Sequence, residues 1–285
     1  MEIEFKRNLP GTLQALVDEI ETAAHREIVV EHVPNLSCGA HAVMIFGDCG
    51  QPGATPDSLQ LILKFKGDPA ATNRIFREPY GMMLHELLHM RRWIVEQIPC
   101  LHFIEGLPPA SVAPDEDPVK RLFTTAGIDE LIEHIGIEQA MPTYGFEGHH
   151  RASFQEVWDS FPSQPWKNWA AMRWVVLQEW IRVVFMTRDS HLWHHAEGVM
   201  RRFGMLDEAR QLTDWFKLLL SSPDKVNAKY GMTLMLAIVF RIPPENFRFL
   251  ERRQGWLGHR GIPTAFEVRT DDGERACSWQ AQKRV

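Results

Sequence analysis

Residues 85 to 89 read His-Glu-Leu-Leu-His and stand inside an apolar stretch that predicts a helix. Residues four apart lie one above the other on the same face of a helix, so His85 and His89 are predicted to stack. Two imidazoles at this spacing can bind one metal ion, with Glu86 beside them as a general base. The pattern therefore predicts a buried helix that carries a metal site.

The flanks of the motif support this helix. Pro79 suits a helix start and Pro99 a stop. Apolar side chains surround the motif on nearly all sides, which is typical of a buried helix: Met82, Met83, Leu84, Leu87, Leu88 and Met90. Buried histidines need polar partners, and a metal ion supplies one. A pair of hydrogen-bonded core histidines is the alternative.

Composition narrows the class of protein. The 285 residues, with 45% hydrophobic and 24% charged, are typical of one large or two small soluble domains. A net charge of −6 argues against nucleic acid or an anionic membrane as the main partner. No apolar signal segment opens the chain, and the longest apolar run, 232–240, is about half a membrane span. We expect a cytoplasmic protein. Its cysteines lack CxxC spacing and are expected to be ordinary thiols: Cys38, Cys49, Cys100 and Cys277.

Periodicity and Gly/Pro breaks predict the elements around the motif. One helix and three strands precede it, at 11–26, 27–33, 41–46 and 58–66. The last strand alternates well and carries lysines, which favours a sheet edge. An acidic loop at 106–118, a short helix at 127–136 capped by Asp129 and a loop at 142–148 follow.

The second half of the chain is predicted to be helical, with a terminal β-hairpin. Helices are expected at 153–161, 166–187, 191–203, 206–221 and 225–240, and hairpin strands at 264–269 and 274–279. The fold class is therefore α+β: a small twisted N-terminal sheet with the HExxH helix, then a mainly α-helical C-terminal half. We expect a domain at 1–150 and a helical domain with the hairpin at 151–285.

The motif and the order of elements over residues 28–150 resemble the zincin superfamily of zinc metallopeptidases, in a gluzincin-like branch. The resemblance implies an edge strand that aligns an extended peptide, and hydrolysis by zinc-bound water that Glu86 activates. The metzincin branch needs a further His after a short Gly-containing extension. Here the chain reads Met90-Arg91-Arg92-Trp93, which argues against that branch.

A catalytic zinc needs a third protein ligand. In gluzincins it is a Glu from a later helix, and the candidates here are Glu130, Glu133, Glu138 and Glu147. We predict Glu133, because it lies on the helix after the acidic loop and Asp129, one turn earlier, could orient a ligand. Glu130 and His134 remain open as alternatives, and His102 is conceivable.

The resemblance also implies a Tyr or His near the oxyanion, for which Tyr144, His149 and His150 are candidates. The predicted catalytic residues are Glu86, Tyr144 and His149, and the predicted metal ligands are His85, His89 and Glu133. Arg92 and Glu96 are expected to pair across one turn. His191 and His195 form a second pair four residues apart, with exposed histidines at a helix start as the simpler interpretation.

These observations predict a Zn²⁺-dependent metallopeptidase that hydrolyses a peptide or protein, with neither nucleic acid nor membrane as partner. The helical half could dock a protein partner. Two alternatives stay open: a helical interaction or regulatory protein with a structural or vestigial metal site, and a zinc-dependent amidohydrolase acting on a non-peptide amide.

Overall fold

The structure is a computed structural model of the chain. It describes residues 9, 11–33, 40–46, 59–65, 77–103, 125–146, 151–161, 169–187, 189–239, 247–253, 256–261, 265–269 and 275–280. The chain folds into two compact units. The first combines Met1–Cys100, Gln139–His149 and Leu250–His259, and the second combines Leu101–Glu138, His150–Phe249 and Arg260–Val285. The two domains expected at 1–150 and 151–285 stay a prediction.

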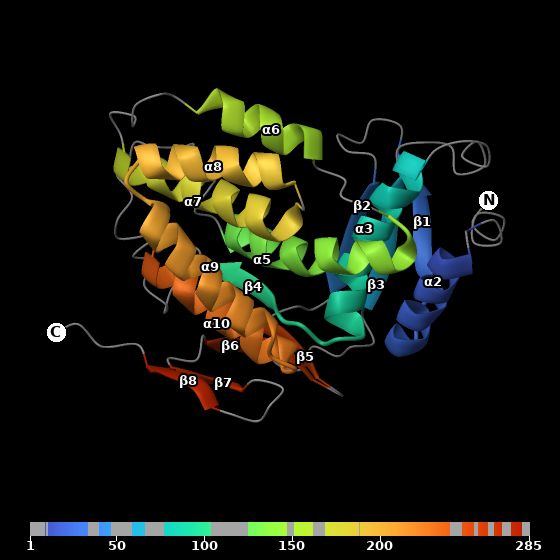
Figure 1. Ribbon diagram of the computed structural model, residues 1–285. Coiled ribbons are helices and arrows are strands. Elements are labelled where there is room, and N and C mark those ends of the chain that lie inside the picture. Colours follow the sequence, from blue (N-terminus) through green and yellow to red (C-terminus); the bar gives the residue numbers. More distant parts are fainter. Residues whose placement is uncertain are drawn as a thin grey trace. The chain divides into compact units, whose positions relative to one another are not determined.

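The first unit holds a three-stranded sheet in the order β1-β3-β2. Its strands are β1 (Ile28–His32), β2 (Ala40–Phe46) and β3 (Leu59–Phe65). β1 runs parallel to β3, with Val30 opposite Leu63, and β2 runs antiparallel to it, with Val43 opposite Ile62. Figure 1 shows this sheet in blue beside the helices α2 and α3.

The strand predicted at 58–66 is found, but its predicted place at a sheet edge is wrong. β3 is the central strand, and Leu61, Ile62 and Leu63 are all buried. Three consecutive apolar residues place buried side chains on both faces, which suits a central strand. Lys64 therefore lies on a central strand, and its Nζ is 4.0 Å from a carboxylate oxygen of Glu31 on the neighbouring strand β1.

Two helices accompany this sheet in the first unit. α2 (Gly11–Ala24) buries the predicted apolar stripe of Leu13, Leu16, Val17 and Ile20. α3 (Arg77–Ile94) carries the HExxH motif and packs against α2 and β2. Its buried leucines and methionines around the motif, Met83, Leu84, Leu87, Leu88 and Met90, are at most 1% exposed, so the predicted burial of this helix is confirmed. Pro79 lies in the first turn and the helix ends five residues before Pro99.

The second unit is mainly helical. Its helices are α5 (Thr125–Ala140), α6 (Arg151–Ser160), α7 (Trp169–Met186), α8 (Ser190–Arg202), α9 (Leu206–Leu220) and α10 (Lys225–Val239). The five helices predicted after residue 150 are confirmed within three residues at each end. Apolar side chains of α5 to α10 form one core, in which Ile128, Val176, Ile181, Phe216 and Leu236 are fully buried.

α5 differs from its prediction in length and in the role of Asp129. The helix was predicted at 127–136 with Asp129 as its N-cap, but it begins at Thr125 and continues to Ala140. Asp129 therefore lies inside the helix, where its carboxylate accepts a hydrogen bond from the Leu101 amide at 3.1 Å. A short 3₁₀ helix, η3 (Met141–Tyr144), follows in the segment predicted as loop.

Short strands complete the fold. β4 (Cys100–Phe103), β5 (Phe247–Arg253) and β6 (Trp256–Gly261) form a sheet in the order β4-β5-β6, which was not predicted. β7 (Ala265–Arg269) and β8 (Arg275–Gln280) pair antiparallel, so the predicted terminal hairpin is confirmed. The α+β class therefore holds. Within the described residues, no helix combines the length and apolar character needed to cross a membrane.

Candidate metal centre

α3 brings the two histidines of the motif together, as the spacing predicted. The ring centroids of His85 and His89 are 5.0 Å apart and the ring planes make an angle of 77°. His85 is 9% exposed, and His89 is half-buried. The surrounding helix is apolar, so these two rings and Glu86 bring polar atoms into a mostly buried face.

The third member of the cluster is His134 of α5. His85, His89 and His134 each offer a ring nitrogen, and these atoms all lie within 4.8 Å of one another. Over the described part of the chain, this is the one group of three or more His, Cys, Asp or Glu side chains arranged closely enough to hold a metal ion. The three imidazoles therefore form a candidate metal centre.

Glu133, the predicted third ligand, binds elsewhere. Its Oε1 accepts a hydrogen bond from Nζ of Lys229 on α10 at 2.5 Å. Within the described residues, the group that could hold a metal ion includes His134 and not Glu133. The geometry thus favours the alternative of His134 over Glu133.

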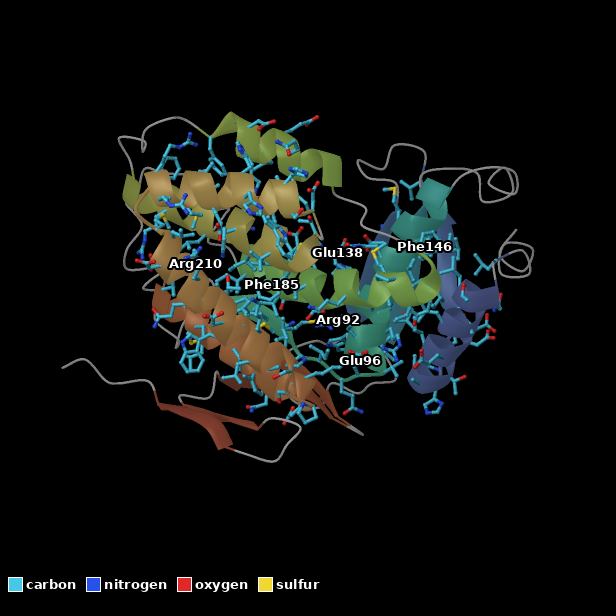
Figure 2. All side chains as sticks on the ribbon, viewed as in Figure 1. Arg92, Glu96, Glu138, Phe146, Phe185 and Arg210 are labelled. Atoms are coloured by element: carbon cyan, nitrogen blue, oxygen red, sulfur yellow. The ribbon has the colours of Figure 1, made fainter. Side chains whose placement is uncertain are left out.

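Of the remaining acidic candidates, Glu130 and Glu138 are described and neither belongs to the group of three histidines. Glu130 is exposed, and its Oε1 lies 3.9 Å from Nδ1 of His134, one turn along α5. Glu138, one turn after His134, is 7% exposed, and burial raises the pKa of its carboxyl to about 7 (Figure 2). His102 falls in β4, but its side chain is outside the described part of the structure. Glu147 is likewise outside the described residues.

The predicted oxyanion residues are only partly described. Tyr144 is the last residue of η3 and is half-buried. Burial raises the pKa of its hydroxyl, Arg91 opposes that shift, and Glu19 and Glu96 add to it. The electrostatic surroundings of Tyr144 are thus an ionic cluster at the end of α3. His149 and His150 lie outside the described residues, so their roles stay predictions.

That ionic cluster contains the predicted pair on α3. An Arg92 guanidinium nitrogen lies 3.8 Å from Oε2 of Glu96, so the pairing across one turn is confirmed (Figure 2). Arg91 also pairs with Glu96 and binds both carboxylate oxygens of Glu19, at 2.9 and 3.1 Å. The charged side chains at this end of α3 therefore link α3 to α2.

The second histidine pair, at the start of α8, does not form a comparable site in the described residues. Nε2 of His195 lies 3.3 Å from a carboxylate oxygen of Asp159, and Nδ1 of His194 lies 2.6 Å from the Ser190 carbonyl oxygen. His191 and His195 belong to no group of three metal-ligating side chains there. His191 and His195 therefore fit the simpler interpretation of exposed histidines at the start of a helix.

Lys229, which binds the predicted ligand Glu133, was not singled out in the sequence analysis. Lys229 is 1% exposed, and its Nζ binds both Glu133 and Asp129, the latter at 2.6 Å. The signal was present, because Lys229 lies within an otherwise apolar helix, and a lysine is almost never buried without an acidic partner. That reasoning predicts an acidic partner for Lys229, but it does not identify Glu133 as that partner.

A comparison with protein-family models, curated proteins and solved structures finds no match to this chain.

Proposed function

We propose that this protein is a metal-dependent hydrolase whose metal ion is bound by His85, His89 and His134. The observation that carries the proposal is the grouping of the three ring nitrogens within 4.8 Å. Two of these residues come from an HExxH helix, where Glu86 follows the first ligand directly. The proposal replaces the expected Glu133 by His134 and keeps the predicted chemistry.

The donor set suits zinc. A tetrahedral site with Zn–N bonds of about 2.0–2.1 Å places its ligand nitrogens about 3.3–3.4 Å apart. The ring nitrogens of the group lie within 4.8 Å of one another, so a bound zinc ion would draw them closer together. Three neutral imidazoles, with a fourth position left open, are also an established ligand set for a catalytic zinc.

The exposure of the ligands favours a catalytic over a structural ion. Structural zinc sites are closed by four protein ligands, whereas the described group has three members. His89 and His134 are both half-buried, so two of the three rings retain contact with solvent. A substrate or a water molecule can therefore approach this group.

Glu86 is the residue that we assign to proton transfer. When bound, zinc acts as a Lewis acid and lowers the pKa of water towards neutrality. The Glu86 carboxylate, half-buried on the same helix, would accept a proton from the attacking water and hold it for the leaving amine. We propose a peptide or protein as the substrate, because the HExxH motif on α3 is the signature of zinc metallopeptidases and an extended peptide could pair with an edge strand, β1 or β2, of the small sheet.

Metal content and one substitution test this proposal. Protein purified without chelator is expected to contain about one zinc per chain by emission spectrometry, and dialysis against a chelator should remove it reversibly. Glu86→Gln should retain the metal and lose hydrolysis of a peptide library by at least 100-fold, since general acid–base catalysis contributes about 10²–10⁴-fold. His194→Ala, at an exposed histidine of α8, is the control and should change neither quantity.

Two results would contradict the proposal. Protein that neither contains zinc nor regains it from solution would exclude the metal centre. Undiminished hydrolysis by Glu86→Gln would remove Glu86 from the reaction. Cleavage of simple amides with peptides left intact would retain the zinc hydrolase and change its substrate class.

A further inference from the structure

Helix α9 carries a groove of about 420 Å³ on the side that faces away from the core of the second unit. The described residues that line this α9 groove all belong to α9 and to the second unit: Asp207, Arg210, Gln211, Asp214, Trp215 and Leu218. They recur every three or four positions, so they form one stripe along about three turns of the helix. The buried side chains of α9 lie on the opposite face, among them Leu212, Phe216 and Leu219.

The apolar part of the α9 groove lies deeper than its polar part. Trp215 and Leu218 are half-buried and pack against the core with part of each side chain. The four polar lining residues are exposed. A tryptophan that keeps part of its ring exposed offers a large apolar surface, and such residues are enriched at protein interfaces. The arrangement is therefore that of an interface: an apolar strip with a polar rim.

The rim of the α9 groove is acidic. Within the described residues, neither the Asp207 nor the Asp214 carboxylate takes part in a hydrogen bond or an ion pair. Arg210 already has a partner, since its guanidinium lies 2.9 Å from Glu197 of α8 (Figure 2). That hydrogen bond raises the pKa of Arg210, and Asp207 adds to the shift. Lys217 of the same helix is not among the described lining residues. The groove thus favours a cationic partner.

The spacing of the two carboxylates favours a helix as the occupant. Asp207 and Asp214 are seven residues apart, which is about 10.5 Å along α9. A helix lying beside α9 returns to the same face every seven residues, so two basic side chains at that spacing can meet both carboxylates. A second copy of this chain is disfavoured, because its net charge of −6 would bring more negative charge to an acidic rim.

We propose that the α9 groove docks a basic amphipathic helix of a partner protein. Lys or Arg residues of that helix, seven positions apart, would pair with Asp207 and Asp214, and its apolar side chains would cover Trp215 and Leu218. This gives the protein partner expected for the helical half a surface and a chemistry. The inference is independent of the metal centre, because no lining residue belongs to the group of three histidines.

Peptide binding tests the inference. The probe is a fluorescein-labelled peptide of about 14 residues, with leucines on one helical face and two lysines seven residues apart beside them. Fluorescence anisotropy should show micromolar binding to the full chain. The double variant Asp207→Asn, Asp214→Asn should bind the probe at least about fivefold more weakly, since it loses both charge contacts. Trp215→Ala should weaken binding at least about tenfold, because tryptophan anchors dominate many interfaces.

Matched controls separate the groove from general effects of charge and exposure. The double variant Asp18→Asn, Glu156→Gln changes the net charge equally, at exposed acids of α2 and α6, and should bind the probe as the parent does. Trp193→Ala removes a tryptophan of α8 that is 39% exposed and lies outside the lining, and should also leave binding unchanged. A peptide of the same composition with lysines five residues apart, on opposite helical faces, should bind at least about fivefold more weakly.

Several results would overturn the inference. Absence of probe binding at about 1 mM, an affinity too weak to matter, would exclude a basic helix as the occupant. Equal binding of the two peptides, or of the parent and the Asp207→Asn, Asp214→Asn variant, would reduce the interaction to non-specific attraction. Dimerisation that Trp215→Ala abolishes, without probe binding, would assign the groove to a second copy of this chain. If Trp215→Ala shows no cooperative unfolding, the aspartate variant decides, because exposed carboxylates contribute little to the fold.

Discussion

The Nζ of Lys229 lies 2.5 Å from Oε1 of Glu133, and this bond gives two neighbouring residues of α5 different partners. Glu133 takes part in a buried ion cluster, while His134 belongs, with His85 and His89, to the group that could hold a metal ion. Because the two residues have different partners, we expect their substitution to weaken metal binding to different extents.

His134→Ala should therefore weaken zinc binding far more than Glu133→Gln. Loss of a ligand should exceed the roughly 10- to 100-fold that outer partners contribute, so we expect more than about 100-fold for His134→Ala and about tenfold or less for Glu133→Gln. Competition with a chromophoric chelator measures both affinities. A larger loss in Glu133→Gln than in His134→Ala would restore Glu133 as the ligand.

Glu138 should make the stability of the metal-free protein depend on pH. Burial raises the pKa of its carboxyl from 4.5 to about 7, so the folded state holds the proton more tightly than the unfolded state. The resulting stabilisation is fully present below pH 4.5 and is lost as the pH rises through 7. Glu138→Gln, which is always neutral, should thus be more stable than the parent at pH 8.

At pH 8 the free energy of unfolding of Glu138→Gln should exceed that of the parent by at most about 3 kcal/mol, at about 1.4 kcal/mol per unit of pKa. Urea unfolding in excess chelator at several values between pH 5 and 8 measures it. Glu156→Gln, at an exposed glutamate of α6, should show no such trend. A constant difference between Glu138→Gln and the parent across this range would exclude the carboxyl of Glu138 as the titrating group.

The local pattern of apolar residues in the sequence was sufficient to predict much of the fold. The stripe of Leu13, Leu16, Val17 and Ile20 and the run around the HExxH motif predicted α2 and α3, because a helix places such residues on faces that must be buried. The alternation of Leu59, Leu61 and Leu63 predicted β3. It did not reveal that β3 is central, because neighbours in a sheet depend on segments distant in the chain.

The candidate site likewise depends in part on contacts between segments that are distant in the chain. His85 and His89 are four residues apart, so the helical repeat alone brought them together. The sequence alone could not choose among Glu130, Glu133 and His134, because the helical repeat does not say which face of a helix meets which partner. Glu133, for example, contacts Lys229, which is 96 residues further along the chain. β4, β5 and β6 were missed for a related reason, because their pairing joins segments far apart in sequence.

Arg91 should contribute measurably to the stability of the first unit. Its guanidinium binds both carboxylate oxygens of Glu19 on α2 and also pairs with Glu96. Bidentate contacts are the stronger kind of ion pair, but partial exposure to solvent screens them. We expect Arg91→Ala to lower the free energy of unfolding by about 1 kcal/mol, and by less at about 1 M salt.

The comparison for Arg91 is Arg210, whose guanidinium lies 2.9 Å from Glu197 at an exposed position (Figure 2). Arg210→Ala should have the smaller effect on urea unfolding, since its single contact is more fully solvated. Equal losses in the two variants would show that the link between α2 and α3 adds nothing beyond an ordinary surface pair.

The hydrogen bond between Trp180 and Thr213 should stabilise the core of the second unit. Nε1 of Trp180 donates to Oγ1 of Thr213 at 2.8 Å, and both side chains are buried. Thr213→Val keeps the shape and leaves the indole N–H without its acceptor, which should cost about 1–3 kcal/mol. In a Trp180→Phe background the same substitution should cost at least about 1 kcal/mol less, because no donor is left to satisfy. Urea unfolding of the parent, the two single variants and the double variant gives this coupling energy directly. Strict additivity of the two substitutions would mean that the bond contributes nothing and that the tryptophan stabilises the core through its apolar area alone.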